Sequence, residues 1–242
     1  MAGPVPNADL LSSLGRLMRG LSALFWGLPI ALVVCVQSAR GEWLRPLGIA
    51  PPVLVTALLC YGVDLLGHFQ KQERIWRAAL DRTRLFALIN LGLSPFLYWW
   101  NKIPSELFYN TMIDLMTVTA LMFLLALNPM LHRLTAMLPD ETLRAETKLF
   151  SMLNRWLLYG IVGVLAVYFV AVRFNPMFLE QVLESALRSL SLPQSGGALL
   201  VLLDRGGLWI VLILVLLPVA MTMALIWKIK EVILASVFGP EH

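Results

Sequence analysis

The stretch Leu107–Leu131, LFYNTMIDLMTVTALMFLLALNPML, contains one charged side chain, that of Asp114. A helix that crosses a bilayer needs about 20 mainly apolar residues, so this stretch is long enough to span one. Five further stretches have the same character: Leu21–Ala39, Leu47–His68, Leu85–Trp100, Trp156–Val172 and Leu208–Trp227. The sequence therefore predicts an all-α, polytopic transmembrane helical bundle of six spans in a single domain, residues 1–242.

The composition agrees with this architecture. Of the 242 residues, 59% are hydrophobic and 14% are charged, whereas soluble domains carry about 25% charged residues. A soluble enzyme, a disordered protein and a secreted disulfide scaffold are therefore excluded. The two cysteines, Cys35 and Cys60, lie inside apolar runs and are interpreted as small buried side chains.

Basic residues predict the orientation of the spans, because Lys and Arg concentrate on the cytoplasmic side of a membrane. With the N-terminus inside, 13 of the 19 basic residues fall in cytoplasmic segments and 6 in outer segments. We therefore expect a multi-pass protein of the cytoplasmic (inner) membrane, with both termini in the cytoplasm and the first span uncleaved. The net charge of +4 follows from the same bias. The sequence has no basic stripe with interleaved stacking aromatics, so a nucleic-acid partner is not expected.

Two connecting segments predict surface helices. Asp140 is a suitable N-cap for an amphipathic helix over residues 141–154 on the inner face. On the outer face, Asn175 followed by Pro176 predicts the start of a second helix over residues 176–190. Each helix would be a brace at the membrane surface or a docking surface for a partner.

A shift of 64 residues aligns the chain with itself. Thr83–Asn90 (TRLFALIN) then matches Thr147–Asn154 (TKLFSMLN), with four identities and four conservative differences. The same shift pairs two more polar positions, Asp64 with Asn128 and His68 with His132. Spans two and three would then repeat as spans four and five, a tandem hairpin of the parallel kind known in membrane proteins.

Polar residues near the cytoplasmic ends of spans two to five form a candidate polar layer. They are Asp64, His68, Asn90, Asn128, His132 and Asn154. Asp64 and His68 are four residues apart, so they share one helix face, as do Asn128 and His132. Asp114 stands apart in the outer half of span four. Ionisable groups inside spans are costly and are therefore candidates for function.

Three chemistries fit the polar layer. Asp64 and His68 suit a proton-coupled transporter or channel, because a carboxylate and an imidazole bracket neutral pH. His68 and His132 suit the axial ligands of a b-type haem. The third interpretation is that the polar groups hydrogen-bond across helices and hold the bundle together. Apart from the haem, no metal or cofactor is expected.

Enzyme signatures do not occur in the sequence: it has no His-Glu-x-x-His, Gly-x-Ser-x-Gly, Walker A or dinucleotide-binding motif. Together with the sparse intramembrane charge, this favours a non-enzymatic integral membrane subunit or scaffold of a membrane assembly. The alternatives are a small-solute or proton-coupled transporter and, third, a haem b subunit. The expected partners are membrane lipid and other membrane proteins or further copies of the chain. Gly160 and Gly163 in span five are expected to allow close helix packing.

Overall fold

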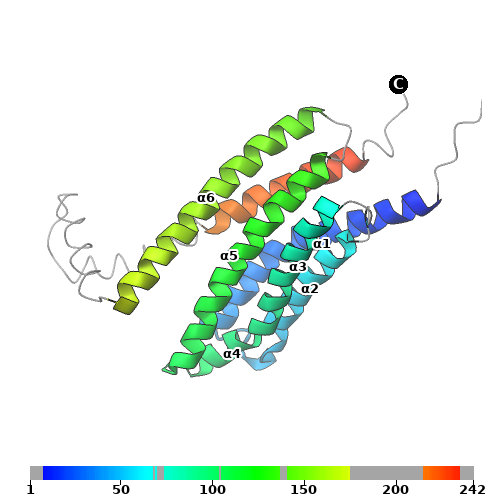
Figure 1. The fold of residues 1–242 in the computed structure, drawn as a ribbon. Helices are drawn as coiled ribbons and strands as arrows, with labels where there is room; N and C mark the ends of the chain where they lie inside the picture. Colours follow the sequence, from blue (N-terminus) through cyan, green and yellow to red (C-terminus); the bar gives the residue numbers. More distant parts are fainter. Residues whose placement is uncertain are drawn as a thin grey trace, which may run out of the picture.

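Helices make up nearly all of the described part of the chain. The structure, a computed structural model, describes residues 8–67, 69, 74–103, 105–136, 141–174 and 215–234, and these ranges contain no strand. The helices are α1 (Ala8–Arg40), α2 (Ala50–Leu66), α3 (Arg74–Leu93), α4 (Pro95–Lys102), α5 (Leu107–Ala136), α6 (Glu141–Phe174) and a helix over residues 215–234, with a short 3-10 helix η1 at Arg45–Leu47 (Figure 1). The prediction of an all-α protein is confirmed.

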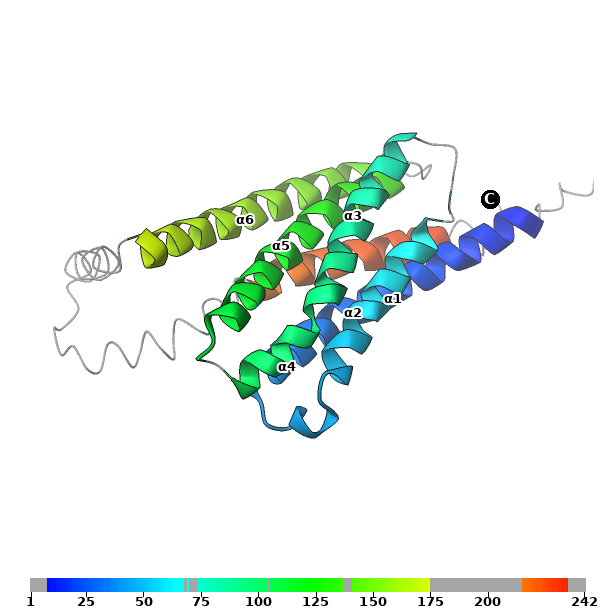
Figure 2. The same ribbon diagram turned by 60° about the horizontal axis from the view of Figure 1, so that its bottom comes forward.

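The helices form an elongated bundle. α1 packs along α2, α3 packs along α5, and α6 packs on α5 (Figures 1 and 2). Helix 215–234 contacts α1, where the rings of Trp227 and Phe25 lie 5.7 Å apart. The start of α1 and the end of helix 215–234 lie at one end of the bundle. We name it the basic end, because exposed cations gather there: Arg16, Arg19, Arg74, Arg77 and Lys148. The helix α4 and η1 lie at the opposite end.

Three helices of the described part are long and apolar enough to cross a membrane. The candidate spans are Ser12–Ala39 in α1, Leu107–Ala136 in α5 and Thr147–Ala166 in α6, and α2 is a shorter apolar helix. The first two contain the first and fourth predicted spans, the third overlaps the fifth predicted span over residues 156–166, and α2 overlaps the second. Residues 208–214 of the sixth predicted span lie outside the described residues. A multi-helical membrane protein is therefore supported, and the count of six spans stays a prediction.

The third predicted span, Leu85–Trp100, falls on two helices instead of one. α3 ends at Leu93, a turn follows at Ser94, and α4 begins at Pro95. Proline has no N–H to donate to the carbonyl of the residue four positions earlier. The hydroxyl of Ser94 donates to that carbonyl, on Leu91, at 2.8 Å. The apolar composition of the stretch does not reveal this break.

Residues 141–154 and 156–172 form one helix, where the sequence predicts two elements. α6 runs from Glu141 to Phe174 without interruption, and neither Pro nor Gly occurs between Glu141 and Tyr159. Residues 147, 151 and 154 are buried in the bundle, so this part of α6 packs against other helices over its inward face. The other predicted surface helix, over residues 176–190, lies outside the described residues.

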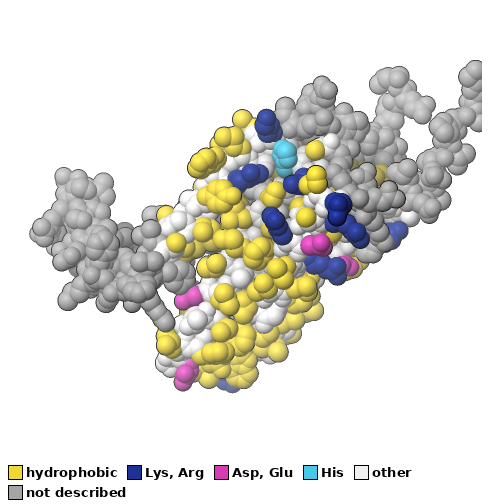
Figure 3. All heavy atoms as spheres, viewed as in Figure 1, with side chains coloured by type: hydrophobic (Ala, Val, Ile, Leu, Met, Phe, Trp, Pro, Cys, Tyr) yellow, Lys and Arg dark blue, Asp and Glu magenta, His cyan; other side chains and the backbone are white. Residues whose placement is uncertain are grey.

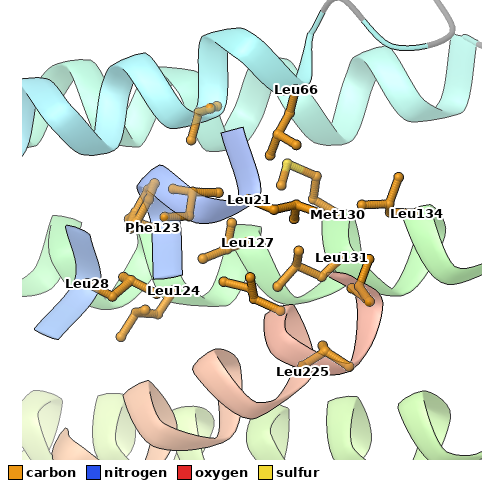
Figure 4. Packing of buried hydrophobic residues seen from close by; sticks show 14 of the residues in the cluster. Leu21, Leu28, Leu66, Phe123, Leu124, Leu127, Met130, Leu131, Leu134 and Leu225 are labelled. Atoms are coloured by element: carbon orange, nitrogen blue, oxygen red, sulfur yellow. The ribbon is translucent and has the colours of Figure 1, made fainter. Parts of the chain in front are cut away.

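The buried core follows the half of α5 nearer the basic end. Leu127, Met130 and Leu131 of α5 are 0% exposed. They belong to one cluster with apolar side chains of α1, α2 and helix 215–234, among them Leu21, Leu66 and Leu225 (Figure 4). α5 is therefore the helix on which the two sides of the bundle meet.

α1 and α2 approach each other through two glycines. A Cβ atom on Gly20 would lie 2.9 Å from the carbonyl oxygen of Gly62, and one on Gly62 would lie 3.2 Å from the carbonyl oxygen of Gly20. Small residues allow such close approach between membrane helices. Gly160 and Gly163 have nothing within 4 Å of a Cβ position. The expectation that these two glycines form a close helix contact is therefore wrong for the described part of the bundle.

Large apolar side chains cover much of the surface away from the basic end (Figure 3). Leu54 and Leu107 are 67% exposed, and Trp156 is 68% exposed. Soluble monomers rarely carry large continuous apolar patches, whereas lipid tails accept such a surface. The surface thus agrees with a membrane location.

Candidate functional site

Asn90 joins α3 to α5. Its side chain is buried, and its Oδ1 accepts a hydrogen bond from the Thr119 hydroxyl at 2.9 Å. Its Nδ2 donates to the carbonyl of Phe86 at 2.9 Å. Both functions of the amide are thus used within the bundle, and Asn90 serves as a link between two helices.

Asn154 makes a similar link on the other side of the bundle. Its Nδ2 donates to the hydroxyl of Thr222 at 3.1 Å, and that hydroxyl donates to the carbonyl of Pro218 at 2.7 Å. The bond joins α6 to helix 215–234. The Oδ1 atom of Asn154 has no hydrogen-bond partner among the described residues.

Asn128 of α5 lacks the kind of partner that the other two asparagines have. It is 1% exposed, and neither of its amide atoms has a hydrogen-bond partner in the described ranges. The buried hydroxyls of Thr147 and Ser151 on α6 also have none there. α5 and α6 are in contact and follow each other as a helical hairpin, so Thr147 and Ser151 lie at about the depth of Asn128. Most of the buried side-chain polar atoms without a hydrogen-bond partner in the described core therefore belong to these three residues.

Asp64 forms an ion pair that joins α2 to α3. Its Oδ1 atom lies 2.8 Å from Nη2 of Arg84, and the two side chains are 44% and 54% exposed, respectively. His68 was the expected partner of Asp64, and it lies outside the described residues. The pairing of Asp64 with His68 therefore stays a prediction.

His132 and Asp114 lie apart from these links. His132 is half-buried on α5, where Arg133, Lys148 and Arg155 are close enough to act on it electrostatically. Asp114 is exposed on α5 toward the opposite end of the bundle. Because His68 is not described, haem ligation by His68 and His132 also stays a prediction.

The candidate residues are spread along the bundle. Asn90 bonds to Thr119, which precedes Asn128 on α5 by nine residues, about 14 Å along a helix. From the sequence, Asn90 and Asn128 are expected at a similar depth. The difference arises because α3 begins at Arg74, well before the apolar stretch, so Asn90 lies near the middle of the bundle.

Removal of the Asp64–Arg84 ion pair is expected to change stability only slightly. Pairs that are this exposed contribute about 0–1 kcal/mol, because water screens them and long side chains lose entropy. A double-mutant cycle with Asp64→Asn and Arg84→Gln, measured by unfolding in detergent micelles, should give a coupling below about 1 kcal/mol. A larger coupling would show that the membrane or a partner shields the pair from water.

Leucine substitutions at Asn90 and Asn128 are expected to act in opposite directions. Asn90→Leu removes the bond to Thr119 and should cost about 0.6 kcal/mol, the average for hydrogen bonds between membrane helices, and at most about 1.7 kcal/mol. Asn128→Leu removes an amide without partners and should be neutral or stabilising, because an unsatisfied buried group costs about 1–3 kcal/mol. Unfolding midpoints of the two variants and the parent protein test this. An equal loss in both variants would mean that Asn128 has a partner outside the described residues.

A cavity of about 460 Å³ lies in the half of the bundle farther from the basic end. Every labelled α-helix and helix 215–234 contribute to its wall. Most lining residues are apolar, and Asn90 is the one member of the candidate polar layer among them. The other residues of the polar layer therefore do not line this space.

Sequence reasoning missed the partners of the polar residues. Thr119 and Arg84 were not singled out, nor was the contact between Thr56 and Ser94, whose hydroxyl oxygens lie 3.2 Å apart. A hydroxyl inside an apolar stretch is a weak signal, because it also bonds to the carbonyl one turn earlier, as Thr56 does with Pro52. Only the packing of the helices shows which hydroxyls meet a second helix.

The described residues contain no group of three or more His, Cys, Asp and Glu side chains that could hold a metal ion. No protein-family model matches the chain, and no curated protein or solved structure matches it either.

Proposed function

We propose that the protein is a non-enzymatic integral membrane subunit or scaffold of a membrane protein assembly. One observation supports this above the alternatives. The buried amides of Asn90 and Asn154 bond to hydroxyls of neighbouring helices instead of converging on a common polar space. Such bonds hold membrane helices together, and a transporter would need polar groups along one path.

We also propose six spans with both termini in the cytoplasm. The start of α1 and the end of helix 215–234 lie at the same end of the bundle (Figures 1 and 2). Cations gather at that end (Figure 3), and the cytoplasmic side of a membrane protein carries the excess of Lys and Arg. The basic end would therefore face the cytoplasm and offer the docking surface for partners.

The tandem hairpin repeat is part of the same proposal. Thr83, Ala87 and Asn90 are buried on α3, and the aligned residues Thr147, Ser151 and Asn154 are buried on α6. In both blocks the asparagine bonds to a threonine on another helix. Equal burial at aligned positions supports equivalent roles for the two helices.

Native mass spectrometry after purification in mild detergent tests the proposed function. A stoichiometric protein partner or a defined homo-oligomer is expected. The charge reversals Arg77→Glu and Lys148→Glu, both at exposed positions of the basic end, should weaken that association. The reversal Arg45→Glu at the opposite end is the matched control, since Arg45 is exposed there as well. A monomer without a partner under all conditions would contradict the proposal.

The transporter alternative has a specific observation in its favour, the unsatisfied buried polar atoms of Asn128, Thr147 and Ser151. Such groups commonly bind buried water, which a proton path requires. In this alternative, Asp64→Asn abolishes flux through reconstituted vesicles while the protein stays folded. Unchanged flux would reject it.

A further inference from the structure

The described residues of the cavity wall offer few hydrogen-bonding groups. Its wall contains Thr56, Asn90, Trp100 and Thr117 as polar residues besides Cys35. The threonine hydroxyls donate to carbonyls one turn earlier, on Pro52 and Ile113. The amide of Asn90 is bonded on both sides, and the Trp100 indole donates to Asn110. The described part of the wall therefore presents mainly hydrocarbon to an occupant.

The cavity is open at membrane depth. Val36 of α1 is 40% exposed and Val164 of α6 is 63% exposed, although both line it. Both residues lie inside candidate membrane spans, Ser12–Ala39 and Thr147–Ala166. In a bilayer, the medium at such an opening is the hydrocarbon interior.

The inner part of the cavity rests on the buried core. Leu28 of α1 and Leu124 of α5 both belong to the core cluster (Figure 4), and both also line the cavity. Ala87, Leu97 and Leu121 line it and are at most 5% exposed. An occupant that reached these residues would be enclosed by the bundle, unlike lipids that only touch its outer surface.

Water does not suit this space. A volume of about 460 Å³ would hold roughly 15 water molecules at about 30 Å³ each, and every buried water needs two to four polar partners. Apolar cavities of about 150 Å³ already stay dry and bind apolar molecules. The volume also falls in the range of about 300–1,000 Å³ that is usual for ligand sites.

We propose that this cavity binds a hydrocarbon chain of a membrane phospholipid, which enters from the surrounding hydrocarbon through the open side of the cavity. The proposal concerns a ligand site and does not depend on whether the protein is a subunit or a transporter. A bound chain would complete the packing of the half of the bundle that is distant from the basic end.

Photo-crosslinking in phosphatidylcholine vesicles tests the proposal. The vesicles contain a small fraction of phosphatidylcholine with a diazirine in one acyl chain, and labelled residues are mapped by mass spectrometry after digestion. Label is expected on the enclosed residues Ala87, Leu97 and Leu121. Exposed Leu54 and Leu88, which do not line the cavity, serve as the reference for lipids at the outer surface.

A matched pair of variants sharpens the test. Ala120→Phe fills the cavity, because Ala120 lines it, whereas Ala224→Phe adds the same side chain at an exposed position outside it. Label on the enclosed residues should fall by about tenfold, the effect of 1.4 kcal/mol, in Ala120→Phe alone, with label on Leu54 unchanged. Label confined to exposed residues in the parent protein would overturn the proposal, as would equal labelling of both variants. If Ala120→Phe does not fold, the labelling pattern of the parent protein still decides.

Discussion

Gly20→Leu is expected to destabilise the protein more than any other single glycine substitution on α1. A Cβ atom at this position meets the carbonyl oxygen of Gly62 at 2.9 Å and Cβ of Leu65 at 3.1 Å. Because the first contact is with backbone, the helices themselves must move apart. Overpacking of this kind costs about 1–3 kcal/mol, which unfolding midpoints in detergent micelles would detect.

Gly15→Leu is the matched control on the same helix. Nothing lies within 4 Å of a Cβ position at Gly15. Leucine also favours the helix over glycine by about 0.5–1 kcal/mol, so the control should be neutral or slightly more stable. If the two variants unfold at the same midpoint, α1 and α2 are not packed through Gly20 and Gly62 in the membrane protein.

Leu127→Ala is expected to cause the second large loss of stability. Leu127 is 0% exposed and belongs to the core cluster that connects α1, α5 and helix 215–234. Truncation of a buried leucine costs about 2–5 kcal/mol, with the larger values where the cavity left behind does not collapse. Helices pack against α5 on both sides and limit the collapse of the cavity that the truncation leaves. A loss in the upper part of this range is therefore expected.

Leu115→Ala on the same helix provides the comparison, since Leu115 is 46% exposed. Its truncation should change the unfolding midpoint little, because lipid or detergent replaces the lost contacts. A loss at Leu115 as large as that at Leu127 would place Leu115 in an interface with another protein. The pair of variants therefore reports on the core and on assembly in one series.

The helices were predictable where apolar length alone determines them. Leu107–Leu131 falls inside α5, and Leu21–Ala39 falls inside α1, because a long apolar run with at most one charge has few other stable states in a membrane. The break at Ser94 was not predictable from composition. It depends on Pro95, which has no N–H, and on the Ser94 hydroxyl, which donates to the carbonyl of Leu91 instead. The unity of α6 was hidden for the opposite reason. The first turns of α6 are charged and its later turns are apolar, and this change in composition indicates a surface helix followed by a separate span.

The polar residues were predictable as buried groups but not as pairs. Asn90 and Asn154 stand out in apolar surroundings, and both are buried. Their partners depend on the rotation and depth of neighbouring helices, which periodicity does not specify. Arg84 illustrates the limit: it precedes the predicted span Leu85–Trp100, and in the structure it lies on α3 and pairs with Asp64 of α2.

The length of α6 has a mechanical consequence. Its 34 residues extend about 51 Å at 1.5 Å per residue, against a hydrocarbon layer of about 30 Å. Tilt alone would have to exceed about 50° to hide it, beyond the range of about 0–40° seen for membrane helices. In a bilayer, part of α6 therefore extends beyond the hydrocarbon layer as a stiff continuation of the intramembrane part. No loop separates the two parts of α6. A displacement of the turns outside the hydrocarbon layer would therefore be transmitted along the helix to the hydrogen bond between Asn154 and Thr222.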